Sequence, residues 1–89
     1  MSQTINNRIK EIILKYLNLE VVDYVEDSDT HLIFSDEKIR HEKDVLDETI
    51  QSIKEELNEA LDDFNFYYAK KITDDLESLA IYYKENWLA

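Results

Sequence analysis

Apolar side chains recur every three or four residues over 4–19, which predicts an amphipathic helix. Charged residues such as Arg8 and Lys15 occupy the opposite side of this helix. We expect Thr4 or Ser2 to be the N-cap, and Asn18 suits a left-handed helix end in a chain that has no glycine. The apolar face contains seven residues, namely Ile5, Ile9, Ile12, Ile13, Tyr16, Leu17 and Leu19.

The next segment, 20–35, has a different pattern. Two short runs at 20–25 and 30–34 are rich in β-branched and aromatic residues, and the polar run 26–29 lies between them. This pattern predicts a β-hairpin with a polar turn. An isolated two-stranded hairpin is marginally stable, so we expect it to pack against a helix.

A helical period returns after Ser35 and predicts a long helix over 36–61, about 39 Å in length. Ser35 or Asp36 is the expected cap. The apolar positions alternate between steps of four and three residues, which is a heptad seam that extends backward through Lys43 to Ile39. The seam consists of Leu46, Ile50, Ile53, Leu57, Ala60 and Phe64.

A turn-like cluster at 62–65 separates this helix from a third one, predicted over 65–88 with Asn65 as its cap. Its apolar stripe consists of Tyr68, Ile72, Leu76, Leu79 and Tyr83. Two antiparallel helices joined by a short turn would pack these stripes together. The alternative is a strand over 64–72, followed by a shorter helix that Thr73 caps.

The predicted fold is therefore α+β and mostly α. It comprises an N-terminal helix, a short β-hairpin and a long antiparallel helical hairpin, all within a single domain over 1–89.

The composition excludes several function classes. The chain has no cysteine and no glycine, so it has no thiolate metal site, no cysteine nucleophile and no glycine-rich phosphate loop. Acidic residues outnumber basic ones by 21 to 10, and the net charge is −11. This charge argues against direct binding to a nucleic-acid backbone or an anionic membrane. Because we see no signal peptide and no long apolar run, we expect a soluble, cytoplasmic protein.

Candidate metal and catalytic sites are weak. The segment 27–31 begins like a calcium loop, but Leu32 and Lys38 stand where the loop needs glycine and glutamate. Four residues share helical spacing without ligands from a second element, and we expect them to form a solvated face: Glu37, His41, Asp44 and Glu48. We therefore expect no metal, no cofactor and no enzymatic activity.

The acidic residues are unevenly distributed. Five form a stripe opposite the heptad seam, namely Asp44, Glu48, Glu55, Glu59 and Asp62. A second acidic patch lies in the predicted hairpin, at Asp23, Glu26, Asp27 and Asp29. One explanation is solubility. The other is a surface that fits a basic groove, because carboxylates one turn apart recur about every 5–6 Å, on the order of the phosphate spacing along one nucleic-acid strand.

A further group of apolar side chains projects away from the stripe of the third helix. These candidates for an apolar interface are Phe66, Tyr67, Ile81 and Leu88. The alternative is that the first helix or the β-hairpin covers them. If they are exposed, they could contact a partner or a second copy of the chain.

Together these patterns predict a binding protein rather than an enzyme. In composition and size the chain is similar to the small anti-restriction and anti-CRISPR proteins of mobile elements such as phages. We expect an inhibitor that occupies the nucleic-acid-binding surface of a basic enzyme or effector complex, without itself contacting nucleic acid or membrane. The alternative is a helical interaction module or homodimeric adaptor that uses its aromatic and apolar face.

Overall fold

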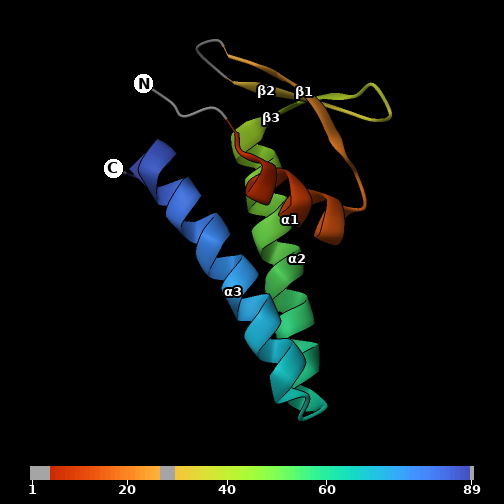
Figure 1. The fold of residues 1–89 in the computed structure, drawn as a ribbon, viewed down its shortest axis with the longest axis vertical. Coiled ribbons are helices and arrows are strands. Elements are labelled where there is room, and N and C mark those ends of the chain that lie inside the picture. The colour runs from red at the N-terminus through yellow and green to blue at the C-terminus, as the bar shows by residue number, and fades with distance from the viewer. Residues whose placement is uncertain (1–4, 27–29, 89) are drawn as a thin grey trace.

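The computed structural model describes residues 5–26 and 30–88, which form a small sheet at one end of a helical body (Figure 1). The elements are α1 (Asn7–Leu17), β1 (Val21–Val25), β2 (His31–Phe34), β3 (Ile39–His41), α2 (Glu42–Asp62), α3 (Phe66–Tyr83) and the π-helical turn η1 (Lys84–Leu88). Helices α2 and α3 form the predicted helical hairpin. The predicted α+β, mostly helical fold class is confirmed.

Helix α1 begins later than the sequence indicated. Its N-cap is Asn6, whose side-chain oxygen accepts a hydrogen bond from the Ile9 amide at 2.9 Å, so the expectation of Thr4 or Ser2 was wrong. Asparagine caps as well as serine or threonine, and periodicity does not fix a helix end to within two residues. The helix ends at Asn18 with φ 56°, the left-handed conformation expected there.

The sheet has three antiparallel strands in the order β1-β2-β3, and β1 with β2 forms the predicted hairpin. Strand β3 was not predicted. It pairs with β2 so that Ile39 lies opposite Ile33 and His41 opposite His31. The four acidic and polar positions of the predicted turn include 27–29, which lie outside the described residues.

A turn over 36–38 and strand β3 together replace the first six residues of the helix predicted from residue 36. Glu37 has φ 65°, which is incompatible with a right-handed helix, and the Asp36 carboxylate accepts from the Lys38 amide in a local turn. Neither Ser35 nor Asp36 is therefore a helix cap, and α2 begins after His41 instead. Ile39, which we had placed in the heptad seam, is an exposed strand residue.

The turn between α2 and α3 is a Schellman motif. The Asn65 amide donates to the Ala60 carbonyl at 2.8 Å, and the Phe64 amide donates to the Leu61 carbonyl at 3.1 Å. Asn65 then caps α3 by accepting from the Tyr68 amide at 3.2 Å, as predicted. Residues 66–72 are helical, so the alternative of a strand over 64–72 is wrong.

The hydrophobic core lies where α1 crosses the helical hairpin beneath the sheet (Figure 1). Every helix and two strands contribute to it. Its fully buried side chains include Ile12, Ile13, Leu32, Phe34, Leu46, Ile53, Ile72 and Leu79. Beyond α1, the ends of α2 and α3 extend as a two-helix arm, whose turn lies at the opposite end of the molecule from the sheet (Figure 1).

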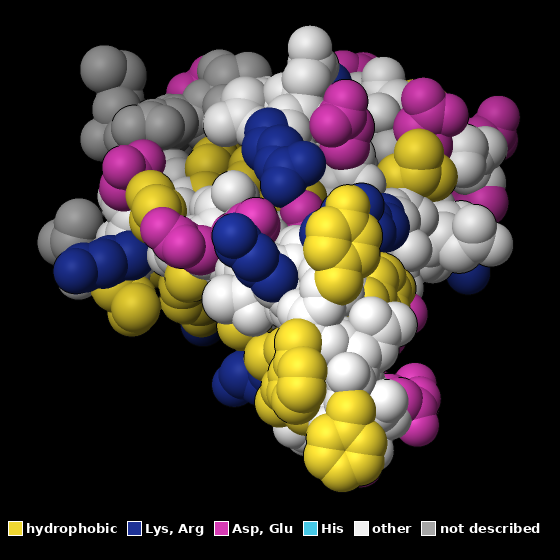
Figure 2. Space-filling view, turned by 60° about the horizontal axis from the view of Figure 1, so that its bottom comes forward, with side chains coloured by type: hydrophobic (Ala, Val, Ile, Leu, Met, Phe, Trp, Pro, Cys, Tyr) yellow, Lys and Arg dark blue, Asp and Glu magenta, His cyan; other side chains and the backbone are white. Residues whose placement is uncertain are grey.

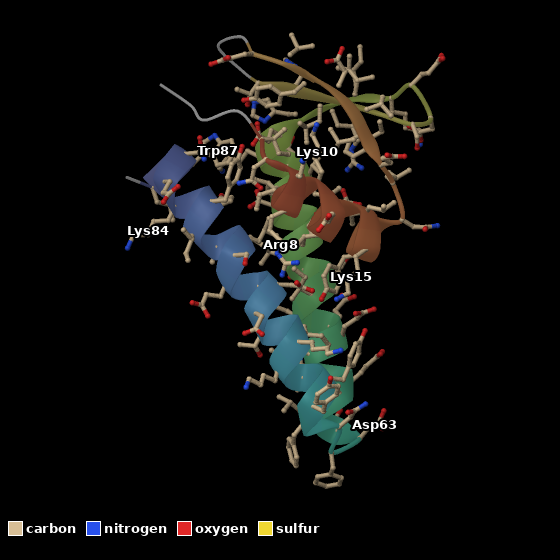
Figure 3. The ribbon with its side chains drawn as sticks, in the orientation of Figure 1. Arg8, Lys10, Lys15, Asp63, Lys84 and Trp87 are labelled. Carbon is tan, nitrogen blue, oxygen red and sulfur yellow. The ribbon has the colours of Figure 1, made fainter. Side chains whose placement is uncertain are left out.

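A buried carboxylate joins α1 to α3. Asp75 accepts hydrogen bonds from Arg8 at 2.6 Å, Lys15 at 2.8 Å and Tyr16 at 2.9 Å. Figure 3 labels Arg8 and Lys15 on α1. Burial by itself would raise the pKa of Asp75, but the hydrogen bonds from Lys15 and Tyr16 and the two positive charges lower it below its ordinary value. The ionised form is therefore the one that stabilises this contact.

A second buried carboxylate, Glu42, joins the sheet to both long helices. Tyr82 donates to it at 2.5 Å, and the side chains of Tyr24 and Thr30 also form hydrogen bonds with it. Its own amide donates to the Thr30 carbonyl at 3.1 Å. Within 5–26 and 30–88, no lysine or arginine forms an ion pair with Glu42, and burial raises its pKa despite these hydrogen bonds.

We predict that Asp75→Asn lowers the free energy of unfolding by about 1–3 kcal/mol. The substitution removes the negative charge of a buried carboxylate that accepts hydrogen bonds from two positively charged side chains and one hydroxyl group. The estimate is moderate because Arg8 and Lys15 are about half exposed and can regain water. Urea denaturation followed by circular dichroism at pH 7 measures the change. Asp74→Asn is the control, since Asp74 is exposed; an equal effect of both substitutions would contradict the prediction.

We also predict a pH-dependent difference between Glu42→Gln and the wild type. A carboxyl group with a raised pKa in the folded state destabilises the fold once it ionises, so wild-type stability falls as pH rises from about 4.5 through the folded-state pKa of Glu42. The glutamine variant lacks this fall, so its stability relative to the wild type should increase across the same window. Urea midpoints from pH 4 to 8 test this, with exposed Glu59→Gln as the control for losing one charge. A constant difference would show that Glu42 does not titrate differently on folding.

Candidate functional site

The acidic stripe predicted on α2 is exposed along its whole length. Its first and last members are 18 residues apart in the sequence, so the stripe runs about 27 Å along the helix. It has no basic residue among its members, and the helix as a whole carries eight acidic and two basic side chains. The five exposed residues are Asp44, Glu48, Glu55, Glu59 and Asp62.

Strand β3 divides this stripe into two parts. Arg40 of β3 forms an ion pair with Glu48, and the same guanidinium lies over the ring of Phe34 with 5.9 Å to its centroid. Asp44 remains on the sheet side of this pair. On the other side Glu55, Glu59 and Asp62 form no ion pair with any residue that the structure describes. We call these three residues the free acidic face.

The free acidic face lies at the less favourable end of its helix. The carboxyl end of a helix carries a partial negative charge, and an acidic side chain there costs about 0.3–1 kcal/mol at low salt. The last turn of α2 contains no basic residue to offset this charge. Glu59 and Asp62, which lie in that last turn, therefore weaken α2 rather than stabilise it, which a purely structural role does not explain.

The second acidic patch does not join the free acidic face. Asp23 lies on β1 and accepts from the Tyr24 amide at 2.7 Å, and Glu26 is exposed just beyond that strand. The sheet and the end of α2 are at opposite ends of the molecule (Figure 1). The other two members of the predicted patch, Asp27 and Asp29, lie outside the described residues.

The four apolar candidates are all exposed, but they do not form one surface. Phe66 and Tyr67 begin α3, whereas Ile81 lies near its other end, about 20 Å away along the helix, and Leu88 lies further on in η1. Two more exposed apolar residues lie at the same end of the helical hairpin as Phe66 and Tyr67, namely Leu61 in the last turn of α2 and Phe64 in the α2–α3 turn, and yellow side chains gather at this end of the molecule in Figure 2. We call this group, Leu61, Phe64, Phe66 and Tyr67, the aromatic tip.

Phe64 is the residue that sequence analysis misplaced most. Its spacing put it in the buried heptad seam, yet its side chain is 77% exposed. The helix ends at Asp62, so the helical period no longer applies two residues later. The ring packs edge to face against Phe66, with 6.3 Å between ring centroids, and its backbone has φ 58°. The Asp62-Asp63 pair was the signal in the sequence that the helix stops before Phe64.

Charges of opposite sign flank the aromatic tip. Glu59, Asp62 and Asp63 lie on the α2 side, and Asp63 is labelled beside the turn in Figure 3. Lys70 and Lys71 lie on the α3 side, and the Lys71 ammonium is 4.7 Å from the centroid of the Tyr67 ring. In the part of the chain that the structure describes, none of these five charged residues forms an ion pair.

The described residues contain no group of three or more histidine and acidic side chains that could hold a metal ion. The helical set considered from the sequence does not exist, because Glu37 lies in a turn and His41 ends β3. A hollow of about 220 Å³ lies between α1 and the start of β1, and its lining mixes Lys10 with Glu11 and Glu20 without buried polar groups that converge on it. Among the described helices, none is long and apolar enough to cross a membrane.

Comparison of the chain with family models, curated proteins and solved structures finds no match.

We predict that Phe64→Asn raises the free energy of unfolding by about 0.5–1 kcal/mol. A left-handed backbone costs a bulky residue about 1–2 kcal/mol, and asparagine tolerates it better. Urea denaturation measures the change. Phe66→Asn is the matched control, because it removes an equally exposed ring from a right-handed helical position. A loss of stability in Phe64→Asn would show that the ring supports the fold.

Proposed function

We propose that the protein is an acidic inhibitor that binds a basic, nucleic-acid-handling protein and blocks the groove in which nucleic acid would lie. Such inhibitors include the anti-restriction and anti-CRISPR proteins of mobile elements. The observation that carries the proposal is the free acidic face: Glu55, Glu59 and Asp62 lie exposed on one side of a regular helix and form no ion pair with the residues that the structure describes.

Rigidity makes such a face suitable for this role. The carboxylates are fixed to a helix whose buried side packs against α3 and α1, so little conformational freedom is lost when they bind. Neighbouring acidic residues one turn apart recur about every 5–6 Å, which suits a groove that holds a phosphate backbone. The net charge of −11 would also steer the protein toward a positively charged surface and speed association.

These acidic residues have unfavourable electrostatic interactions within α2. Glu55 and Glu59 are one turn apart and repel each other, and Asp62 adds to the negative end of the helix dipole. A single lysine among them would relieve both effects. Solubility alone does not require the charges to gather here, because acidic residues elsewhere on the surface serve it equally well.

We predict that the triple variant Glu55→Lys, Glu59→Lys and Asp62→Lys loses binding to its target at least tenfold without losing stability. The positions are exposed, and lysine favours the carboxyl end of a helix, so the variant should remain folded. The immobilised wild-type protein should capture a nucleic-acid-binding protein from lysate at about 50 mM salt, release it at about 200 mM, and be displaced by duplex DNA. The purified target then allows affinity and inhibition of DNA binding to be measured directly.

The matched control is Asp74→Lys, Glu77→Lys and Glu85→Lys, which makes the same change in net charge at exposed positions on α3 and η1. This control should keep most of the affinity. Equal losses in the two triple variants would mean that only net charge matters. Retained inhibition in the α2 triple variant would exclude the free acidic face as the binding surface.

A further inference from the structure

The aromatic tip combines three features that do not stabilise the free monomer. Phe64 holds a left-handed backbone with a bulky side chain, and it does so in a position where asparagine or glycine is usual. Three aromatic rings are largely in water, with exposed fractions of 77% for Phe64, 63% for Phe66 and 75% for Tyr67. Acidic residues flank them at the negative end of α2. Such a concentration of local costs is typical of a functional surface.

The charged residues on the two sides of the rings have opposite signs, so the surface is complementary to a second copy of itself. The acidic flank, Glu59, Asp62 and Asp63, comes from α2, and the basic flank, Lys70 and Lys71, comes from α3. A two-fold axis through the tip would place the acidic flank of one copy against the basic flank of the other, twice. We propose that the aromatic tip binds a second copy of this chain, tip to tip, in a symmetric dimer.

The exposed area is sufficient for a weak dimer. An aromatic side chain carries roughly 150–250 Å² of surface, so the three rings expose about 400 Å² in one copy. Two copies would bury about 800 Å² from the rings, and Leu61 with the charged flanks brings the total to about 1,000 Å². This area is at the lower end of specific interfaces, so we expect a weak dimer whose population depends on protein concentration.

The shape of the molecule permits this contact. The tip is the end of the two-helix arm and lies away from the sheet and α1 (Figure 1), so two arms can meet end to end without contact between their bodies. The acidic residues of the sheets would then be far apart compared with the Debye length of about 8–10 Å at physiological salt. Anionic membranes are a poor alternative partner, because the same acidic flank would repel them.

Sedimentation equilibrium of the full chain from about 5 to 500 µM tests the proposal. The wild type should change from monomer to dimer within this range. Phe64→Asn removes one ring and suits the left-handed backbone, so it should stay folded and weaken dimerisation at least tenfold. Ile81→Asn is the matched control, because it removes an exposed apolar side chain from the other end of α3 and should dimerise like the wild type.

Charge exchange provides the second test. The double variant Asp62→Lys, Asp63→Lys makes the acidic flank basic except at Glu59, so both flanks then carry lysines. The double variant Lys70→Glu, Lys71→Glu makes the basic flank acidic, so both flanks then carry carboxylates. Each double variant alone should dimerise more weakly than the wild type, and an equimolar mixture of the two should form a heterodimer. If the mixture dimerises no more strongly than either variant alone, the tip-to-tip arrangement is excluded.

Two other outcomes would overturn the proposal. A wild type that is monomeric at every concentration does not use the tip for self-association. A monomer that cosediments with phosphatidylcholine vesicles, and loses this property in Phe64→Asn, uses the tip on a bilayer instead. Failure here is separate from failure of the proposed inhibition, because Phe64→Asn removes a ring of the aromatic tip and leaves Glu55, Glu59 and Asp62 unchanged. This variant should therefore lose dimerisation and keep inhibition.

Discussion

The contact between α1 and α3 through Asp75 is the constraint on which the shape of this protein depends. Arg8, Lys15 and Tyr16 all reach the same carboxylate, so α1 is held across the part of the helical hairpin nearest the sheet. The isoleucine face of α1 fills the core there. Among residues 5–26 and 30–88, no third layer covers the remaining ends of α2 and α3, which is why the aromatic tip is exposed while residues of the same helices closer to the sheet are buried.

The small sheet has a second effect, on the distribution of charge. Strand β3 brings Arg40 to Glu48, so the part of α2 nearest the sheet is partly neutralised. The three residues of the free acidic face lie on the other side of this pair, toward the aromatic tip. The free acidic face is thus a neighbour of the aromatic tip, and Glu59 and Asp62 belong to both the face and the acidic flank of the tip. A partner that contacts the free acidic face near its end would also approach the rings.

The fold class was predictable from periodicity and from the few residues able to cap helices in a chain without glycine. Asn18 and Asn65 mark real helix boundaries because asparagine tolerates the required conformations. Strand β3 was not predictable, because three residues that fit a helical period form a strand only when β2 is available for pairing. For the same reason, the sequence does not show which acidic side chains are buried. Among 21 acidic side chains, nothing local distinguishes the buried Glu42 and Asp75 from the rest, since their partners come from distant elements.

The absence of glycine and proline affects the unfolded chain as well as the folded one. In the described part of the chain, four positions outside the helices have positive φ without glycine: Asn18, Thr30, Glu37 and Phe64. The positive φ strains each of these residues to some degree in the folded state. In the unfolded state, however, each has fewer backbone conformations than a glycine would have, so less backbone entropy is lost on folding. Because the chain contains no proline, no prolyl isomerisation can delay its refolding. A fully denatured chain should therefore refold without the slow phase, on the order of tens of seconds, that prolyl isomerisation causes.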